Sequence, residues 1–197
     1  MRRNYNLEII RMISCFFVIV IHVTNYFCRA YGEITQSEYL FALLLDTLAR
    51  VSVPCFFMIS GALLLGREEP LKKHRERLLR FLIALVVWSV VYYIWNRAFM
   101  KTEYDLKEIL YVPTEPHLWY LYAMIPIYMV LPFFQVMCKG MSGKLERALL
   151  VVCSASVVFN YVVSLQNGEA YYDLPLIGDK VYMLYIFIGH FIYKYRR

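Results

Sequence analysis

The chain has 197 residues, of which 60% are hydrophobic and 18% are charged, and its mean hydropathy is +0.49. Soluble domains are nearer half apolar and a quarter charged, so this composition excludes an ordinary soluble domain and indicates an integral membrane protein. In such a protein, orientation signals and anionic lipid headgroups explain the net charge of +6 better than nucleic acid does. We therefore expect a lipid bilayer around the chain and no nucleic-acid partner.

The apolar pattern predicts an all-α fold, a polytopic bundle of about six transmembrane helices. A span needs roughly 20 apolar residues of helix. The predicted spans cover residues 7–27, 41–66, 79–99, 118–137, 147–166 and 176–193. Because no internal repeat or linker interrupts them, residues 1–197 are predicted to form a single transmembrane domain.

The first predicted span carries two polar side chains, Arg11 and His22. A cation near the bilayer centre costs on the order of 2.5–3.5 kcal/mol on insertion scales, so ionisable residues in a span are candidate functional residues. Eleven positions place the pair about 16 Å apart along a helix and on nearly the same face. The alternatives are that Arg11 extends to the headgroups and that His22 bonds a neighbouring helix.

The second predicted span is too long for one straight helix, so its first part is expected to be an amphipathic or tilted lead-in before Pro54. Asp46 and Arg50 are four residues apart in this part, a spacing that favours an ion pair. Proline removes a backbone donor and so frees a carbonyl. Ser60 and Gly61 follow; they are candidates to line a cavity or contact an acceptor, and close helix packing is the alternative.

A basic segment, residues 67–80, follows the second span and contains six lysines and arginines. Orientation and lipid binding explain most of them. Arg77 and Arg80, however, are three residues apart and share a helix face that leads into the third span. Guanidinium groups bind phosphates well, so these two arginines are candidates to hold a phosphorylated cytosolic molecule.

The fourth predicted span begins at His117 and Trp119 and contains Pro126 and Pro132. Two prolines predict a kinked helix that could line a cavity. Aromatic residues at this end form an interfacial belt in the first interpretation. In the second interpretation they stack on a sugar, which makes His117 and Trp119 candidate acceptor-contacting or cavity-lining residues.

The loops predict the orientation of the chain. Fourteen lysines and arginines lie in the segments on the amino-terminal side of the membrane and five in the opposite loops. By the positive-inside rule both termini are cytoplasmic, which places Arg11 near the cytoplasmic surface and His22 in the outer half. The five cysteines form neither a CxxC pair nor a Cys/His cluster, so no metal site is predicted.

Four stretches together, in this order, resemble the acyltransferase-3 family of membrane acyltransferases. That family has an arginine and a histidine separated by ten residues in its first helix, as Arg11 and His22 are. The other matches are VPCFFMISGALL from Val53, the arginine pair of the basic segment, HLWYL from His117, and the segment Tyr182–Tyr193.

The resemblance implies a multi-pass enzyme of the plasma membrane that moves an acyl group, usually from acetyl-CoA, to a hydroxyl of a surface polysaccharide or similar glycan. The acyl-CoA is a donor substrate, and no permanently bound cofactor is expected. Arg11, Arg77 and Arg80 would hold the donor phosphates, and Arg11 would also assist the chemistry. His22 would be the general base, since imidazole can accept a proton at neutral pH.

Members of this family usually have about ten spans, whereas six are predicted here. We therefore expect a shortened protein, a gene fragment, or one part of an enzyme whose missing helices come from a second membrane subunit. The alternative function is a catalytically inactive copy, or a translocation or accessory component, because polar residues within the membrane suit translocation as well.

Overall fold

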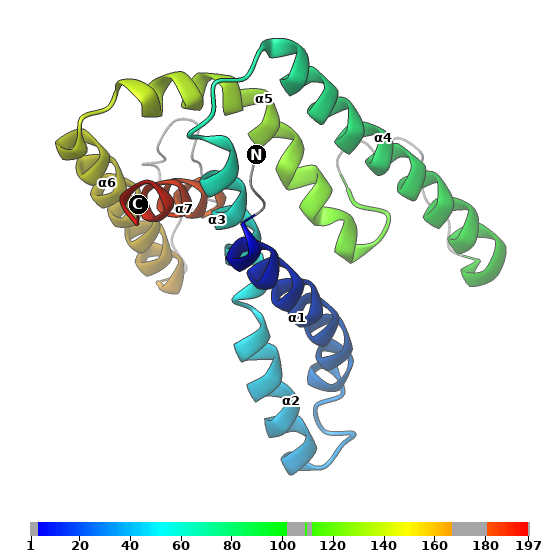
Figure 1. The fold of residues 1–197 in the computed structure, drawn as a ribbon. Helices are drawn as coiled ribbons and strands as arrows, with labels where there is room; N and C mark the ends of the chain where they lie inside the picture. The colour runs from blue at the N-terminus through cyan, green and yellow to red at the C-terminus, as the bar shows by residue number, and fades with distance from the viewer. Residues whose placement is uncertain (1–3, 102–108, 110–111, 167–180, 197) are drawn as a thin grey trace. The chain divides into compact units, whose positions relative to one another are not determined.

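The computed structural model describes residues 4–101, 109, 112–166 and 181–196. These residues form helices and no strand, which confirms the predicted all-α class (Figure 1). The helices are α1 (Tyr5–Arg29), α2 (Gln36–Ala49), α3 (Ser52–Leu64), α4 (Leu71–Trp95), α5 (Trp119–Gly140), α6 (Gly143–Leu165) and α7 (Tyr182–Tyr195). A π-helical turn, η1 (Asn96–Met100), extends α4, and a 3₁₀ turn, η3 (Pro116–Leu118), precedes α5.

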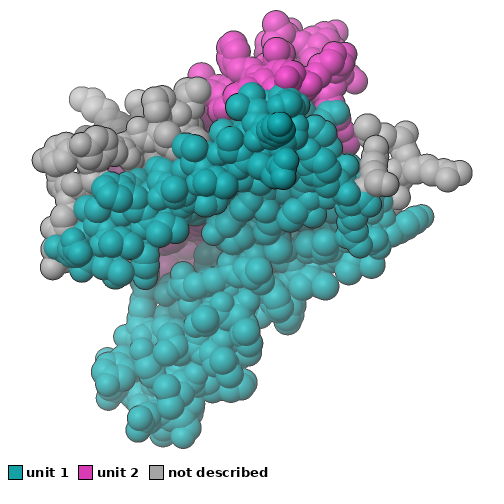
Figure 2. Space-filling model, turned by 90° about the vertical axis from the view of Figure 1, so that its left-hand side faces the viewer, with its two compact units in different colours: residues 1–66, 141–197 teal, residues 67–140 magenta. Residues whose placement is uncertain are grey.

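The contacts divide the chain into two compact units, coloured separately in Figure 2; the single transmembrane domain remains a prediction. Unit 1 consists of residues 1–66 and 141–197 and contains α1, α2, α3, α6 and α7. Unit 2 consists of residues 67–140 and contains α4 and α5 with the two short turns. Each unit is described by itself below.

The centre of unit 1 is the crossing of α3 and α7, whose backbones touch. A Cβ atom added to Gly61 would lie 1.9 Å from the carbonyl oxygen of Ile186, and one added to Gly189 would lie 2.0 Å from that of Met58. Glycine at both positions lets the helices approach closely, as small residues do in membrane proteins. Phe57 stacks on Tyr182 beside the crossing, with ring centroids 4.7 Å apart.

Helix α2 packs along α1, and a buried carboxylate lies in their contact. Asp46 accepts a hydrogen bond from the Thr24 hydroxyl at 3.2 Å and pairs with Arg50 at 2.6 Å. The predicted Asp46–Arg50 pair is thus confirmed. The helix break lies at Arg50 and Val51, before Pro54, which occupies the first turn of α3, where a missing N–H removes no intrahelical bond.

A second buried acid joins α6 to α7. Glu146 lies in the first turn of α6 and is only 1% exposed. Its carboxylate accepts a hydrogen bond from the Tyr195 hydroxyl at 2.6 Å and forms an ion pair with Lys194. These contacts connect the start of one helix with the end of the other.

In unit 2, α4 packs against α5. The Phe81 ring contacts that of Tyr128, with centroids 4.7 Å apart. Helix α5 contains Pro126 and Pro132 and changes direction along its length (Figure 1). The predicted kink is therefore confirmed, and the two prolines explain it, because each interrupts the hydrogen-bond ladder of the helix.

Five helical segments in the described part of the chain are long and apolar enough to cross a membrane: Tyr5–Arg29, Gln36–Leu64, Leu71–Met100, Pro116–Gly140 and Gly143–Leu165. They correspond to the first five predicted spans. The start of the sixth, residues 176–180, lies outside the described residues, as does most of residues 102–115 between the third and fourth predicted spans. Helix α7 itself has 14 residues. The sixth span and the cytoplasmic location of both termini remain predictions.

Candidate functional site

The predicted pair Arg11 and His22 lies on one continuous helix, α1. The unbroken helix keeps the spacing of about 16 Å along its axis. His22 is exposed, and Arg11 is half-buried and pairs with Glu8 through a 3.1 Å contact. Glu8 was not among the predicted site residues, although its position three residues before Arg11 places it on the same face.

Ser60 and Gly61 take different places on α3. Gly61 is buried at the α7 crossing, and this is the close helix packing that the sequence analysis kept as the alternative. The Ser60 hydroxyl donates to the carbonyl oxygen of Phe56 at 2.9 Å, a local bond within the same helix. A role of either residue toward an acceptor remains a prediction.

The predicted arginine pair lines a hollow on the surface of unit 2, near the start of α4. Lys73, Glu76, Arg77 and Arg80 surround this hollow, whose volume is about 180 Å³. Residues 73, 76, 77 and 80 share one helix face, because they are separated by three or four positions. The α4 hollow therefore carries three cations and one acid, a composition that suits an anionic ligand.

One side of the Arg77 guanidinium is held by an acid outside the hollow. Nη2 donates to Oε2 of Glu69 at 2.9 Å, while Nη1 is buried and has no hydrogen-bond partner among the described residues. A buried donor without a partner costs about 1–3 kcal/mol. Nη1 of Arg77 is therefore an unused donor on a residue that lines the hollow.

Glu69 itself is well shielded. Its side chain is 10% exposed and also lies 3.7 Å from Nη1 of Arg67. Burial raises the pKa of its carboxyl group, but the hydrogen bond from Arg77 and the charges of Arg77, Arg67 and His74 outweigh burial and leave this pKa below the ordinary value. Glu69 is thus ionised at neutral pH and keeps its charge for Arg77.

His74 lies one turn before Arg77 on α4 and is 5% exposed. Both ring nitrogens are buried and have no hydrogen-bond partner in the part of the chain that the structure describes. The sequence analysis placed His74 within the basic segment and gave it no role. Buried polar groups are normally paired, so His74 and Arg77 form a region of unused hydrogen-bonding capacity.

The adjacent acid, Glu68, has a different environment. Its side chain is 78% exposed and pairs with Lys139 at the end of α5. The hydrogen bond and the charge of Lys139 lower the pKa of Glu68. Pairs this exposed contribute little to stability, so Glu68 is a natural control for Glu69.

His117 and Trp119 lie at the far end of unit 2. The His117 ring meets the Tyr92 ring edge-to-face at 5.0 Å, and Trp119 contacts Tyr120. Nearby, buried Asn96 donates to Glu115 at 3.0 Å. The polar and aromatic groups here are consistent with both predicted interpretations, an interfacial belt and contact with an acceptor.

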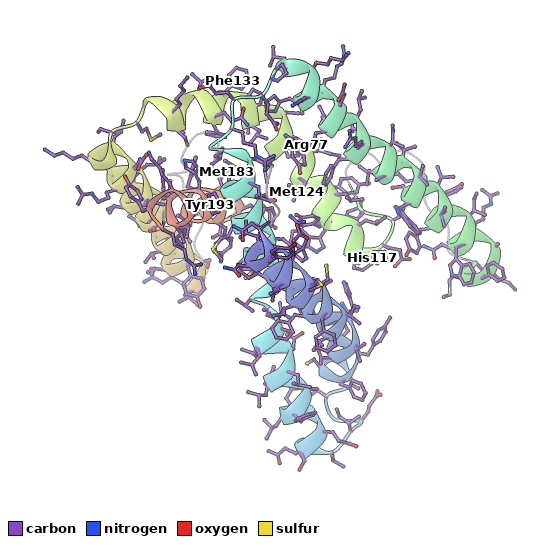
Figure 3. The ribbon with its side chains drawn as sticks, in the orientation of Figure 1. Arg77, His117, Met124, Phe133, Met183 and Tyr193 are labelled. Atoms are coloured by element: carbon purple, nitrogen blue, oxygen red, sulfur yellow. The ribbon has the colours of Figure 1, made fainter. Side chains whose placement is uncertain are left out.

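Arg77 and His117 lie at separate places in unit 2 (Figure 3). Tyr92, which contacts His117, follows Arg77 on α4 by 15 residues, or about 22 Å. The unit thus brings Arg77 together with Arg80 and separates both from His117 and Trp119. The other four predicted residues, Arg11, His22, Ser60 and Gly61, belong to unit 1.

Sequence reasoning missed Glu69, His74, Lys73 and Glu76 as neighbours of the arginine pair. The helical spacing could have indicated Lys73 and Glu76, because both lie three or four residues from Arg77 or Arg80. Glu69 precedes the helix and offered no such periodic signal.

Comparison with known proteins identifies the family. The sequence model of one family, described as an acyltransferase domain, matches residues 4–197. No curated protein and no solved structure matches the chain. The family match covers nearly the whole sequence and agrees with the motifs found in α1, α3, α4 and α5, so the chain belongs to the acyltransferase-3 family of multi-pass membrane acyltransferases.

Proposed function

We propose that this chain is an O-acyltransferase of the plasma membrane. It moves an acetyl group from cytosolic acetyl-CoA to a hydroxyl of a cell-surface polysaccharide or similar glycan. The observation that carries the proposal is the α4 hollow, which is lined by the cations Lys73, Arg77 and Arg80; Nη1 of Arg77 has no hydrogen-bond partner in the part of the chain that the structure describes. Clustered cations with an unused donor favour a phosphorylated donor such as acetyl-CoA.

In the proposed reaction, Arg77 and Arg80 bind donor phosphates and Arg11 contributes a further positive charge. The acceptor hydroxyl oxygen forms a bond with the acyl carbon, and the thioester carbon–sulfur bond breaks. His22 takes the hydroxyl proton as general base, a contribution of typically about 10²–10⁴-fold. The proton then passes to the departing thiolate of coenzyme A. Ser60, Gly61, His117 and Trp119 are proposed to serve the acceptor side.

The test of catalysis is His22→Gln, which keeps a polar side chain of similar size and removes the basic nitrogen. We expect it to abolish transfer from labelled acetyl-CoA to the surface acceptor in membranes, with protein levels checked by blot. Cys15→Ser, an exposed position on the same helix, should retain transfer. A fully active His22→Gln variant would remove the catalytic assignment, and a wild-type chain without transfer would favour an inactive copy or a translocation component.

The test of donor binding is the donor KM of Arg77→Ala and Arg80→Ala. One charge-assisted contact is worth about 1.5–3 kcal/mol, so each variant should raise the donor KM roughly tenfold to a hundredfold while the acceptor KM changes less. Arg77→Lys should rescue poorly, because an ammonium group cannot reproduce the planar fork. Normal donor KM values in both alanine variants would mean that these arginines are only orientation signals.

A further inference from the structure

Glu69 lies at the entrance to α4 and is not among the residues that line the α4 hollow. It directly precedes Pro70, the N-cap residue of α4, and the helix begins at Leu71. The proline ring fixes the backbone angle of its own residue and restricts that of Glu69 before it. The carboxylate therefore projects from a constrained backbone, and its Oε2 meets Nη2 of Arg77 at 2.9 Å.

The contact with Glu69 restricts the orientation of the Arg77 guanidinium. A guanidinium group is planar, so a hydrogen bond at Nη2 restricts the direction in which Nη1 points. Nη1 is buried and has no hydrogen-bond partner among the described residues, while Arg77 lines the hollow. Glu69 thus occupies one nitrogen of the fork and restricts the plane in which the other, still unused, nitrogen lies.

Electrostatic repulsion alone predicts that Glu69 weakens the binding of an anionic ligand. A carboxylate near an anion site repels the ligand, so its neutralisation should strengthen phosphate binding. If the carboxylate instead orients Arg77, its neutralisation should weaken binding, because the released guanidinium must be ordered again when the ligand arrives. The sign of the change therefore distinguishes orientation from repulsion.

We propose that Glu69 is a positioning residue that orients Arg77 for the phosphate groups of the acyl donor. The proposal rests on the proposed donor site and adds to it a residue that does not line the hollow. Glu69 is suited to this role because it is shielded from water and contacts Arg77 through one guanidinium nitrogen only. Exposed Glu68, one residue earlier, contacts Lys139 and not Arg77.

The experiment measures equilibrium binding of labelled coenzyme A to the membrane-embedded full chain. Glu69→Gln keeps the size and one acceptor oxygen but removes the charge. We expect it to weaken binding about threefold to tenfold, which is the cost of immobilising one long side chain, here Arg77, when the ligand binds. Glu68→Gln, the matched control, should leave binding unchanged. Glu76→Gln removes an acid that lines the hollow and should tighten binding, because it removes repulsion of the phosphate groups.

A double-variant cycle separates positioning from a general effect on folding. In an Arg77→Ala background, Glu69→Gln should cause no further loss, because the group that it orients is gone. The proposal is overturned if Glu69→Gln binds coenzyme A as well as or better than the wild type. It is also overturned if the loss persists at full size in the Arg77→Ala background, since Glu69 would then act on the fold.

The same measurements show which proposal fails. Absence of coenzyme A binding by the wild type, or unchanged binding in Arg77→Ala, overturns the donor site and the role of Glu69 together. Weakened binding in Arg77→Ala with unchanged binding in Glu69→Gln overturns only the positioning role.

Discussion

The substitution Gly61→Ala places a methyl group where the backbone of α7 already lies. The added Cβ would be 1.9 Å from the carbonyl oxygen of Ile186, whereas a carbon atom normally stays about 3.3 Å or more from such an oxygen. The shortfall is about 1.4 Å. Because the obstructing atom belongs to the backbone, a change of side-chain rotamer cannot relieve it, and α3 must move away from α7.

Separation of the two helices costs packing energy along the crossing. A gap of 0.5–1 Å already removes about a quarter to a half of the attraction between facing atoms, and the buried residues Phe57, Ile186 and Phe187 lie here. Ordinary overpacking costs about 1–3 kcal/mol, so a backbone clash should cost about 3 kcal/mol or more. For a chain of this length that corresponds to a drop of roughly 6–12 °C in the unfolding midpoint.

The assay is thermal unfolding of the detergent-solubilised chain, followed by size-exclusion chromatography of a fluorescent fusion. Gly140→Ala is the matched control, because nothing lies within 4 Å of its added Cβ. Gly189→Ala should lower the midpoint as Gly61→Ala does, and the double variant should cost less than the sum, since one separation relieves both clashes. If Gly61→Ala unfolds at the temperature of Gly140→Ala, the close approach of α3 and α7 is wrong.

Two further predictions concern orientation and the α6–α7 contact. In a background without the five native cysteines, Thr102→Cys should react with an impermeant thiol reagent added outside the cell and Ser142→Cys should not; reversed labelling would overturn the topology. Glu146→Gln should lower the unfolding midpoint by the equivalent of about 1–2 kcal/mol, because it leaves Lys194 without its charged partner, whereas exposed Arg147→Gln should have little effect.

Features set by helical periodicity could be predicted from the sequence. The spacing of Arg11 and His22, the pair Asp46–Arg50 and the kink at the prolines of α5 all depend on residues within a few turns of one another. The 3.6-residue period and the chemistry of proline decide such features before any tertiary contact forms.

Partners distant in the sequence could not be predicted in this way. Gly61 indicated close packing, but its contact, Ile186, is 125 residues away, and a small residue does not specify which helix approaches it. Glu69 contacts Arg77 across the boundary between a loop and a helix, where no single period relates the two positions. The predicted helices were therefore largely correct, while the environment of the predicted arginine pair needed the structure.

The acids of the basic segment bear on the proposal that an orientation signal and a donor-binding site share one stretch of chain. Orientation depends on the number of lysines and arginines near the membrane, and aspartate and glutamate contribute little to it. Topology alone therefore gives no reason for Glu68 and Glu69 to lie among six cations. The structure gives each a different contact: Glu68 reaches Lys139 on α5, and Glu69 holds Arg77. A topology signal needs only positive charge. The contact with Glu69 also restricts the direction of the Arg77 guanidinium, and the recognition of a phosphate by a guanidinium fork depends on that direction.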